Sequence, residues 1–256
     1  SVPFGPLLAW KRGDLLGASQ RLVAAGLLSL ATLIFVIAWT SGGAVLAPCA
    51  IALAVFVIVG AMTDLVEKTG LLRLAPSVSF ARAVGLPRST WGTAFAHAGL
   101  GVALLGIVCE TTWNIERIVS IRPSETVSVG GFDVKLDGLT LRQGPNYREQ
   151  LAHFSILLDG SVVGELSPSK RSFSARRSAT TEAALLTRGV SQIYISLGDE
   201  KADGSVDVRL YYKPLVLLIW LGAVLMAFGG FLSLSDRRLR IGAPKSARTA
   251  SLQPAE

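Results

Sequence analysis

Residues 22–63 read LVAAGLLSLATLIFVIAWTSGGAVLAPCAIALAVFVIVGAMT, a run of 42 residues without Asp, Glu, Lys or Arg. About 20 apolar residues in a helix cross the hydrocarbon core of a bilayer, so this run is long enough to cross it twice. Ser41-Gly42-Gly43 interrupts the run near its middle and is typical of a turn. The stretch therefore predicts a hairpin of two membrane helices, at residues 22–40 and 44–62.

Two further stretches, residues 89–109 and 214–235, also lack charged residues, and each is about one span long. Half of the 256 residues are hydrophobic and 17% are charged, which excludes a disordered chain or a coiled coil. Two cysteines are too few for a disulfide-stabilised module. We therefore predict a membrane protein with four transmembrane α-helices. The expected organisation is an N-terminal segment 1–21, the helical hairpin 22–63, a loop 64–88, a third helix 89–110, an all-β domain 111–212, a fourth helix 213–236 and a disordered tail 237–256.

Positive charges indicate how the chain is oriented. They precede the first span, separate the second from the third, and follow the fourth, at Lys11, Arg12, Arg21, Lys68, Arg73, Arg82, Arg88, Arg237, Arg238, Arg240, Lys245 and Arg248. The positive-inside rule makes that side cytoplasmic and places residues 111–212 outside. Because residues 111–212 hold twelve basic and twelve acidic residues, the net charge of +7 belongs to the rest of the chain. We interpret it as a topology signal and expect no nucleic-acid partner.

Residues 118–212 alternate between apolar and polar side chains, which is typical of strands. Gly130-Gly131 and Asp159-Gly160 each separate two such runs, as hairpin turns do. Residues 192–197 and 206–211 form a third expected pair around the loop 198–205. The spacing predicts a small β-sandwich or barrel-like domain. Residues 179–187 fit either a short helical turn or an extended crossing.

The β domain offers no nucleophile–base pair, metal-ligand spacing or phosphate loop. His153 is interpreted as a half-exposed polar residue. A basic cluster favours a solvated face over a clamp for a carboxylate or propionate; its members are Lys170, Arg171, Arg176 and Arg177. Cys49 and Cys109 lie in or at the end of membrane helices, where cysteine is usually an apolar filler.

His97 is the candidate site residue. It lies within the third predicted span, where an imidazole is costly unless it is paired, hydrated or bound to a ligand. Small residues surround it, among them Ala94, Ala98 and Gly101. Such residues permit close helix packing, and they also permit a flat macrocycle to lie beside an axial histidine. The residues alone leave both interpretations open.

Several motifs occur in an order that resembles a known family. They are Trp10-Lys-Arg-Gly-Asp14, Ala96-His97-Ala-Gly-Leu-Gly-Val, Asn114-Ile-Glu-Arg117, Thr181-Glu-Ala-Ala184, Leu197-Gly-Asp-Glu200, Arg209-Leu-Tyr-Tyr-Lys-Pro214, Ile219-Trp-Leu-Gly222, Met226-Ala-Phe-Gly-Gly230 and Asp236-Arg-Arg. Together they resemble the C-terminal part of CcmF, the haem-lyase subunit of cytochrome c maturation, and its NrfE paralogues. The resemblance extends over nearly the whole chain.

This resemblance implies a multi-pass protein of the bacterial inner membrane with its β domain in the periplasm. It implies haem as substrate, taken from the chaperone CcmE and attached, with CcmH and CcmI, to the Cys-x-x-Cys-His thiols of apocytochrome c. It also implies a haem b within the membrane, with His97 as one axial iron ligand and the second ligand upstream of Ser1. The Trp-rich haem-handling motif is absent here, so the fragment alone is not expected to be catalytic. The chain, which begins without Met, is expected to be the C-terminal piece of a longer protein.

Two alternatives remain at this stage. One is a membrane-anchored assembly scaffold with an external β docking domain and no haem. The other is a transporter segment, which one histidine and one proline within the spans fit poorly.

Overall fold

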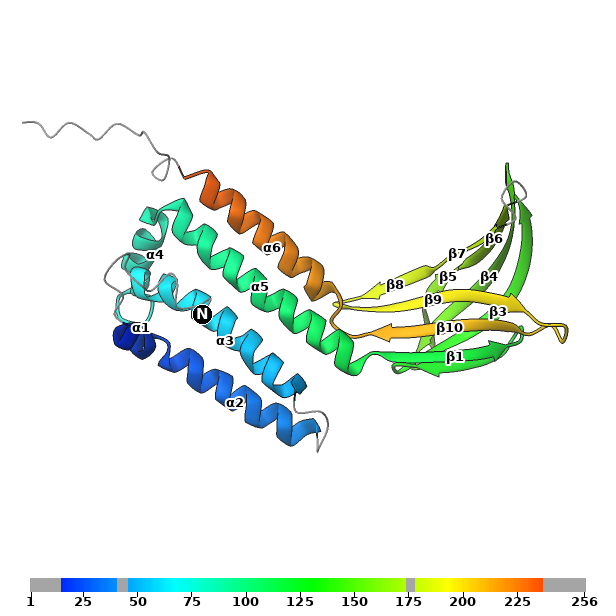
Figure 1. The fold of residues 1–256 in the computed structure, drawn as a ribbon, viewed down its shortest axis with the longest axis horizontal. Helices are drawn as coiled ribbons and strands as arrows, with labels where there is room; N and C mark the ends of the chain where they lie inside the picture. Colours follow the sequence, from blue (N-terminus) through cyan, green and yellow to red (C-terminus); the bar gives the residue numbers. More distant parts are fainter. Residues whose placement is uncertain (1–14, 41–45, 174–177, 237–256) are drawn as a thin grey trace, which may run out of the picture.

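The computed structural model describes residues 15–40, 46–173 and 178–236, and within them four long apolar helices lie side by side with a β-sandwich at one end (Figure 1). These helices are α2 (Val23–Thr40), α3 (Leu46–Thr69), α5 (Arg88–Trp113) and α6 (Leu217–Leu234). Each is long and apolar enough to cross a membrane. The β-sandwich lies between α5 and α6 in the sequence, so the predicted fold class is confirmed.

The cytoplasmic loop expected at residues 64–88 contains more helix than the charge pattern suggested. Helix α3 continues to Thr69, and a separate helix, α4, spans Pro76–Gly85. The last two turns of α3 accommodate charge because the Lys68 ammonium lies 2.6 Å from the Asp64 carboxylate one turn earlier. A short helix α1 (Leu15–Arg21) precedes α2. The Ser41-Gly42-Gly43 turn lies outside the described residues.

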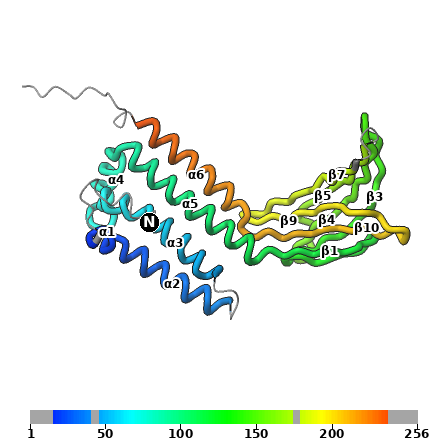
Figure 2. Tube along the Cα trace, in the orientation of Figure 1, coloured from blue at the N-terminus to red at the C-terminus, as the bar shows by residue number. Residues whose placement is uncertain are grey.

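Helix α5 is central in the helical part, with α6 packed along one side and α3 along the other, and α2 packs against α3 (Figure 2). Glycines permit the close approach of α5 and α6. A Cβ added to Gly99 would lie 2.7 Å from the carbonyl oxygen of Gly222, and one on Gly92 would lie 2.5 Å from that of Gly229. Membrane helices associate by such close packing, because lipid provides no hydrophobic force between them.

The β domain consists of two antiparallel sheets. Its strands are β1 (Ile115–Ile121), β2 (Thr126–Val129), β3 (Phe132–Gln143), β4 (Tyr147–Leu158), β5 (Ser161–Leu166), β6 (Ser169–Phe173), β7 (Ser178–Glu182), β8 (Ala184–Arg188), β9 (Ser191–Glu200) and β10 (Val206–Lys213). Among the described residues, one sheet has the order β1-β10-β9-β8 and the other β2-β3-β4-β6-β7, with β5 paired to part of β4.

The predicted hairpin turns are confirmed at Gly130-Gly131, between β2 and β3, and at Asp159-Gly160, between β4 and β5. The third predicted pair corresponds to β9 and β10. Residues 179–187, for which two conformations remained open, are extended. They form most of β7 and β8, which belong to different sheets, so the chain crosses from one sheet to the other here.

The core of the sandwich comes from the inner faces of both sheets. Its fully buried side chains include Phe154, Ile156 and Leu136 from one sheet and Ile195 and Leu210 from the other. Alternate residues on these strands point inward, as the period-2 pattern of the sequence requires. The core contains no cysteine, so apolar burial rather than a disulfide stabilises the domain.

Close contacts join the β domain to its two helices. The Lys213 ammonium at the end of β10 lies 3.2 Å from the carboxylate of Glu110 in α5. The backbone N–H of Leu217, the first residue of α6, donates to the carbonyl oxygen of Val190 in the turn between β8 and β9 at 3.2 Å. The backbone N–H of Leu215 donates to the hydroxyl of Ser191 at 3.2 Å. These contacts hold the base of the sandwich against the ends of α5 and α6.

Candidate functional site

His97 lies in α5 and is half-buried, and its Nδ1 is enclosed without a hydrogen-bond partner among the described residues. The other ring nitrogen, Nε2, is not enclosed in this way. An unsatisfied buried polar atom costs stability, and native structures contain few of them. The imidazole therefore requires an explanation that the described helices do not provide.

The small residues around His97 have a packing role. A Cβ on Gly101 would lie 2.6 Å from the side chain of Ile58 in α3, so this face of α5 contacts α3. Gly92, Gly99 and Gly106 contact α6 in the same manner. Helix packing thus accounts for the glycines, and they need no macrocycle to explain them. It does not account for the histidine.

The flank of α5 on which His97 lies is partly open. Gly101 is four residues after His97, so the imidazole lies near the α3 side of the helix. Leu100, three residues after His97, is 40% exposed, and Ile107, one heptad further, is 46% exposed. Within the described residues, the imidazole therefore lies at the border between the α3 contact and an uncovered apolar flank.

The β domain contains a buried carboxylate that the sequence analysis did not identify. The side chain of Glu149 in β4 is fully buried, and its two oxygens accept hydrogen bonds from Arg142 in β3 and Arg171 in β6. The Nε of Arg171 lies 2.9 Å from Glu149 Oε2, and its guanidinium stacks over the Tyr147 ring, 4.9 Å from the centroid. Arg171 also pairs with Glu182. Hydrogen bonding from Arg171, with a further contribution from Arg142, holds the pKa of Glu149 below its usual range.

This ion-pair cluster corrects the interpretation of Arg171 as part of a solvated basic face. The guanidinium is 29% exposed and has two carboxylate partners, so it has a structural role in the sheet. Lys170 pairs with Asp199 of the opposite sheet. Arg176 and Arg177 lie outside the described residues.

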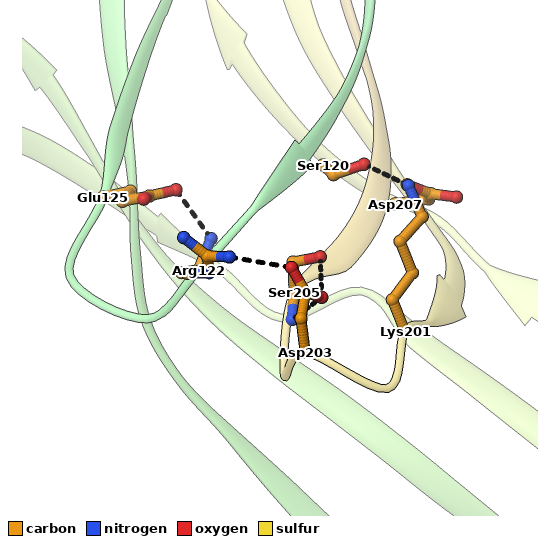
Figure 3. A network of polar contacts seen from close by, with 7 residues as sticks. All are labelled: Ser120, Arg122, Glu125, Lys201, Asp203, Ser205 and Asp207. Atoms are coloured by element: carbon orange, nitrogen blue, oxygen red, sulfur yellow. Dashed lines mark hydrogen bonds and ion pairs between the residues drawn. The ribbon is translucent and has the colours of Figure 1, made fainter.

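A second polar network joins the hairpin between β9 and β10 to the end of β1 and the following turn (Figure 3). Its members are Ser120, Arg122, Glu125, Lys201, Asp203, Ser205 and Asp207. The Arg122 guanidinium lies 2.8 Å from Asp203, whose other oxygen accepts from the hydroxyl and the N–H of Ser205. Hydrogen bonds from Ser205, supported by Arg122, lower the pKa of Asp203 to about 2. Since the carboxylates here have partners within the network, it stabilises the hairpin and offers no open ligand site.

The remaining candidates show no reactive arrangement. His153 is half-exposed, as predicted, and its ring nitrogens lie 2.9 Å from the Thr140 hydroxyl and 3.2 Å from the Ser167 hydroxyl. Cys49 and Cys109 are free thiols on separate helices. No cluster of three or more His, Cys, Asp or Glu side chains that could hold a metal ion occurs in the described part of the chain.

Four membrane-crossing helices and an inserted β-sandwich define a multi-pass membrane protein with a sizeable domain on one side. The sequence profile of the CcmF C-terminal beta-sandwich matches residues 112–214. The cytochrome c-type biogenesis protein CycK of Bradyrhizobium diazoefficiens is 66% identical over 257 aligned positions, and that of Rhizobium meliloti is 52% identical over 249. These alignments cover 100% and 97% of this chain, and 39% and 37% of the two relatives.

Among solved structures, a cytochrome c haem lyase CcmF has the same fold. Its TM-score is 0.69 at 21% identity, and the match covers 91% of this chain and 37% of that one. The chain is homologous to the C-terminal region of the CycK, Ccl1 and CcmF cytochrome c biogenesis proteins. It spans somewhat more than a third of the length of these relatives.

Proposed function

We propose that this chain acts in cytochrome c maturation as the C-terminal part of a membrane haem-lyase subunit, with His97 as one axial ligand of a haem b within the membrane. One observation carries the proposal for the site. His97 is the only histidine in the membrane-crossing helices, and its Nδ1 is enclosed without a partner in the described structure. The homology to cytochrome c biogenesis proteins supports the proposed role in cytochrome c maturation.

The imidazole fits the role of an axial ligand. Iron would bond to Nε2, which is not enclosed, and the neutral ring would then carry its proton on Nδ1. An acceptor for that proton, like the second axial ligand, would come from residues outside those described here. The packing of α5 between α3 and α6 would hold the ring in place. When bound, haem b would supply electrons that keep the iron of the substrate haem ferrous during thioether formation.

The β domain has a docking role in this proposal. It would receive CcmH, CcmI or the apocytochrome in the periplasm, while CcmE delivers the substrate haem. The ion-pair clusters support this assignment, because they stabilise strands and hairpins without leaving a nucleophile beside a base. The chain alone would then bind and position its partners without ligating haem.

The spectrum of the purified full-length protein tests the site. His97→Ala should remove the Soret and α bands of haem b, and His97→Met should retain a haem with altered bands because a thioether can replace the imidazole. His153→Ala is the matched control and should leave the spectrum unchanged. Full bands in the His97→Ala protein would contradict the assignment.

A scaffold without haem is the second candidate, and the glycine packing favours it, because α5 associates with both neighbours without any cofactor. In that case the purified full-length protein would show no Soret band.

A further inference from the structure

A hollow of about 410 Å³ lies where α3, α4 and α5 meet. Figure 1 shows α4 at the end of the helices remote from the β domain. Its walls are mostly apolar and include Met62, Leu65 and Val66 of α3, Phe80 and Ala83 of α4, and Trp91 of α5. The indole N–H of Trp91 donates to the carbonyl oxygen of Ala83 at 3.2 Å and holds α4 against α5. Tryptophan in such a position is typical of the boundary between acyl chains and headgroups.

One polar atom in this wall has no partner. Ser79 is 1% exposed, and its hydroxyl makes no hydrogen bond with any described residue. The Thr69 hydroxyl, also in the wall, instead donates to the carbonyl oxygen of Leu65 at 2.7 Å. A ligand with an acceptor oxygen at this depth would satisfy Ser79.

Helix α4 has an apolar flank and a second flank that carries an arginine. Phe80, in the wall of the hollow, and Val84, one turn further along α4, form an apolar flank and are 72% and 71% exposed. Arg82 lies on the other flank, and its guanidinium reaches the turn at Gly70 that follows α3, where a Cβ would lie 3.7 Å from Nη1. A short helix with these two flanks, at the ends of membrane helices, suits the interfacial layer of a bilayer.

Positive charge predominates in the segment that forms the hollow. Residues 68–109 contain no Asp or Glu, and Arg73 and Arg82 have no ion-pair partner among the described residues. The nearby acidic residues of α3, Asp64 and Glu67, pair with Lys68 and Arg21. An anionic ligand complements this surface better than a zwitterionic one.

We propose that the hollow binds one acyl chain of an anionic phospholipid, with the Ser79 hydroxyl donating to the ester carbonyl and Arg82 contacting the phosphate. The acyl chain covers the apolar wall, the ester satisfies the buried hydroxyl, and the headgroup neutralises the arginine. The site is independent of the haem proposal and lies at the opposite end of the helices from the β domain.

Native mass spectrometry of the full-length protein in detergent measures the preference for an anionic over a zwitterionic phospholipid. Palmitoyl-oleoyl-phosphatidylglycerol should bind several-fold more tightly than the corresponding phosphatidylcholine. Arg82→Gln should weaken phosphatidylglycerol binding about fivefold, and Ser79→Ala should weaken binding of both lipids about threefold. Arg188→Gln, at an exposed position in the β domain, should leave the binding of both lipids unchanged. Equal binding of the two lipids, or an unchanged Arg82→Gln protein, would overturn the proposal.

Photo-crosslinking locates the site and identifies what covers it. Benzoylphenylalanine at position 80, in full-length protein in equimolar phosphatidylglycerol and phosphatidylcholine vesicles, should crosslink mainly to phosphatidylglycerol. The same probe at Trp220, a 68% exposed residue of α6, should label the two lipids equally. A crosslink from position 80 to another segment of the protein, in place of lipid, would refute a lipid site.

Discussion

His97 and Glu149 both have polar atoms enclosed within the protein, and they differ in how these atoms are satisfied. Glu149 has no exposed side-chain surface and is held between Arg142 and Arg171. His97 has an enclosed nitrogen with no partner in the described residues. The first arrangement is complete within this chain and indicates structure. The second is incomplete, and this is why it supports a ligand proposal.

Breaking the Glu149 cluster should destabilise the β domain. Glu149→Gln removes the negative charge and leaves the guanidiniums of Arg142 and Arg171 beside a buried neutral amide. The amide cannot replace both charge-assisted hydrogen bonds that the carboxylate accepts. We expect the thermal midpoint of the purified protein to fall by about 5 °C or more, measured by near-ultraviolet circular dichroism.

Glu165→Gln is the control for this substitution, because Glu165 is exposed on β5 and should tolerate the change. Equal midpoints for the Glu149→Gln and wild-type proteins would show that the cluster does not contribute to stability.

The sequence identified His97 but not Glu149, for a physical reason. A histidine within a charge-free run can be recognised from the sequence alone. The partners of Glu149 come from the two neighbouring strands β3 and β6, and Arg171 is 22 residues away, so their meeting depends on strand pairing and register. Alternation on β4 predicts which residues share a face, but it does not predict which side chains of neighbouring strands cover them.

At the scale of elements, hydropathy was sufficient to find the four long helices, because a lipid-exposed span must be apolar over its length. It did not identify α4, which is ten residues long and largely exposed. Nor did it place the end of α3, since that helix continues to Thr69 through the charged residues Asp64, Glu67 and Lys68. The crossing at β7 and β8 also remained open, because a short extended segment and a helical turn have similar composition.

The contact of α5 with α6 depends on glycine at particular positions. A Cβ on Gly229 would lie 2.5 Å from the backbone nitrogen of Ala96, whereas a Cβ on the adjacent Gly230 would have no atom within 4 Å. Gly229→Ala should therefore separate the helices and lower the stability of the helical part by about 1–3 kcal/mol.

Gly230→Ala is a matched control, with the same substitution one residue further along the same helix, and it should be neutral or slightly stabilising. Thermal unfolding in detergent, followed by the fluorescence of the helix-borne tryptophans, compares the two. Similar unfolding midpoints for both variants would contradict a glycine-dependent interface.

Across the whole molecule, the sandwich and the helical part meet at one end of the helices, and α4 lies at the other (Figure 1). The chain enters the β domain from α5 and leaves it into α6, and these two helices pack along their length. The ion pair between Lys213 and Glu110 adds to this connection. A partner that binds the β domain would therefore act on the same helix that carries His97.

The distribution of positive charge predicts that the β domain is periplasmic, and two equally exposed leucines provide a test. Leu141 in β3 is 85% exposed, and Leu72 in the segment between α3 and α4 is 84% exposed. In a background with Cys49→Ser and Cys109→Ala, each leucine is replaced singly by cysteine. A membrane-impermeant maleimide added to intact spheroplasts should label the Leu141→Cys protein. It should label the Leu72→Cys protein only after lysis, because the arginines near Leu72 hold that end of the helices on the cytoplasmic side. The reverse pattern would invert the topology and place the proposed docking domain in the cytoplasm, where it could not receive periplasmic apocytochrome.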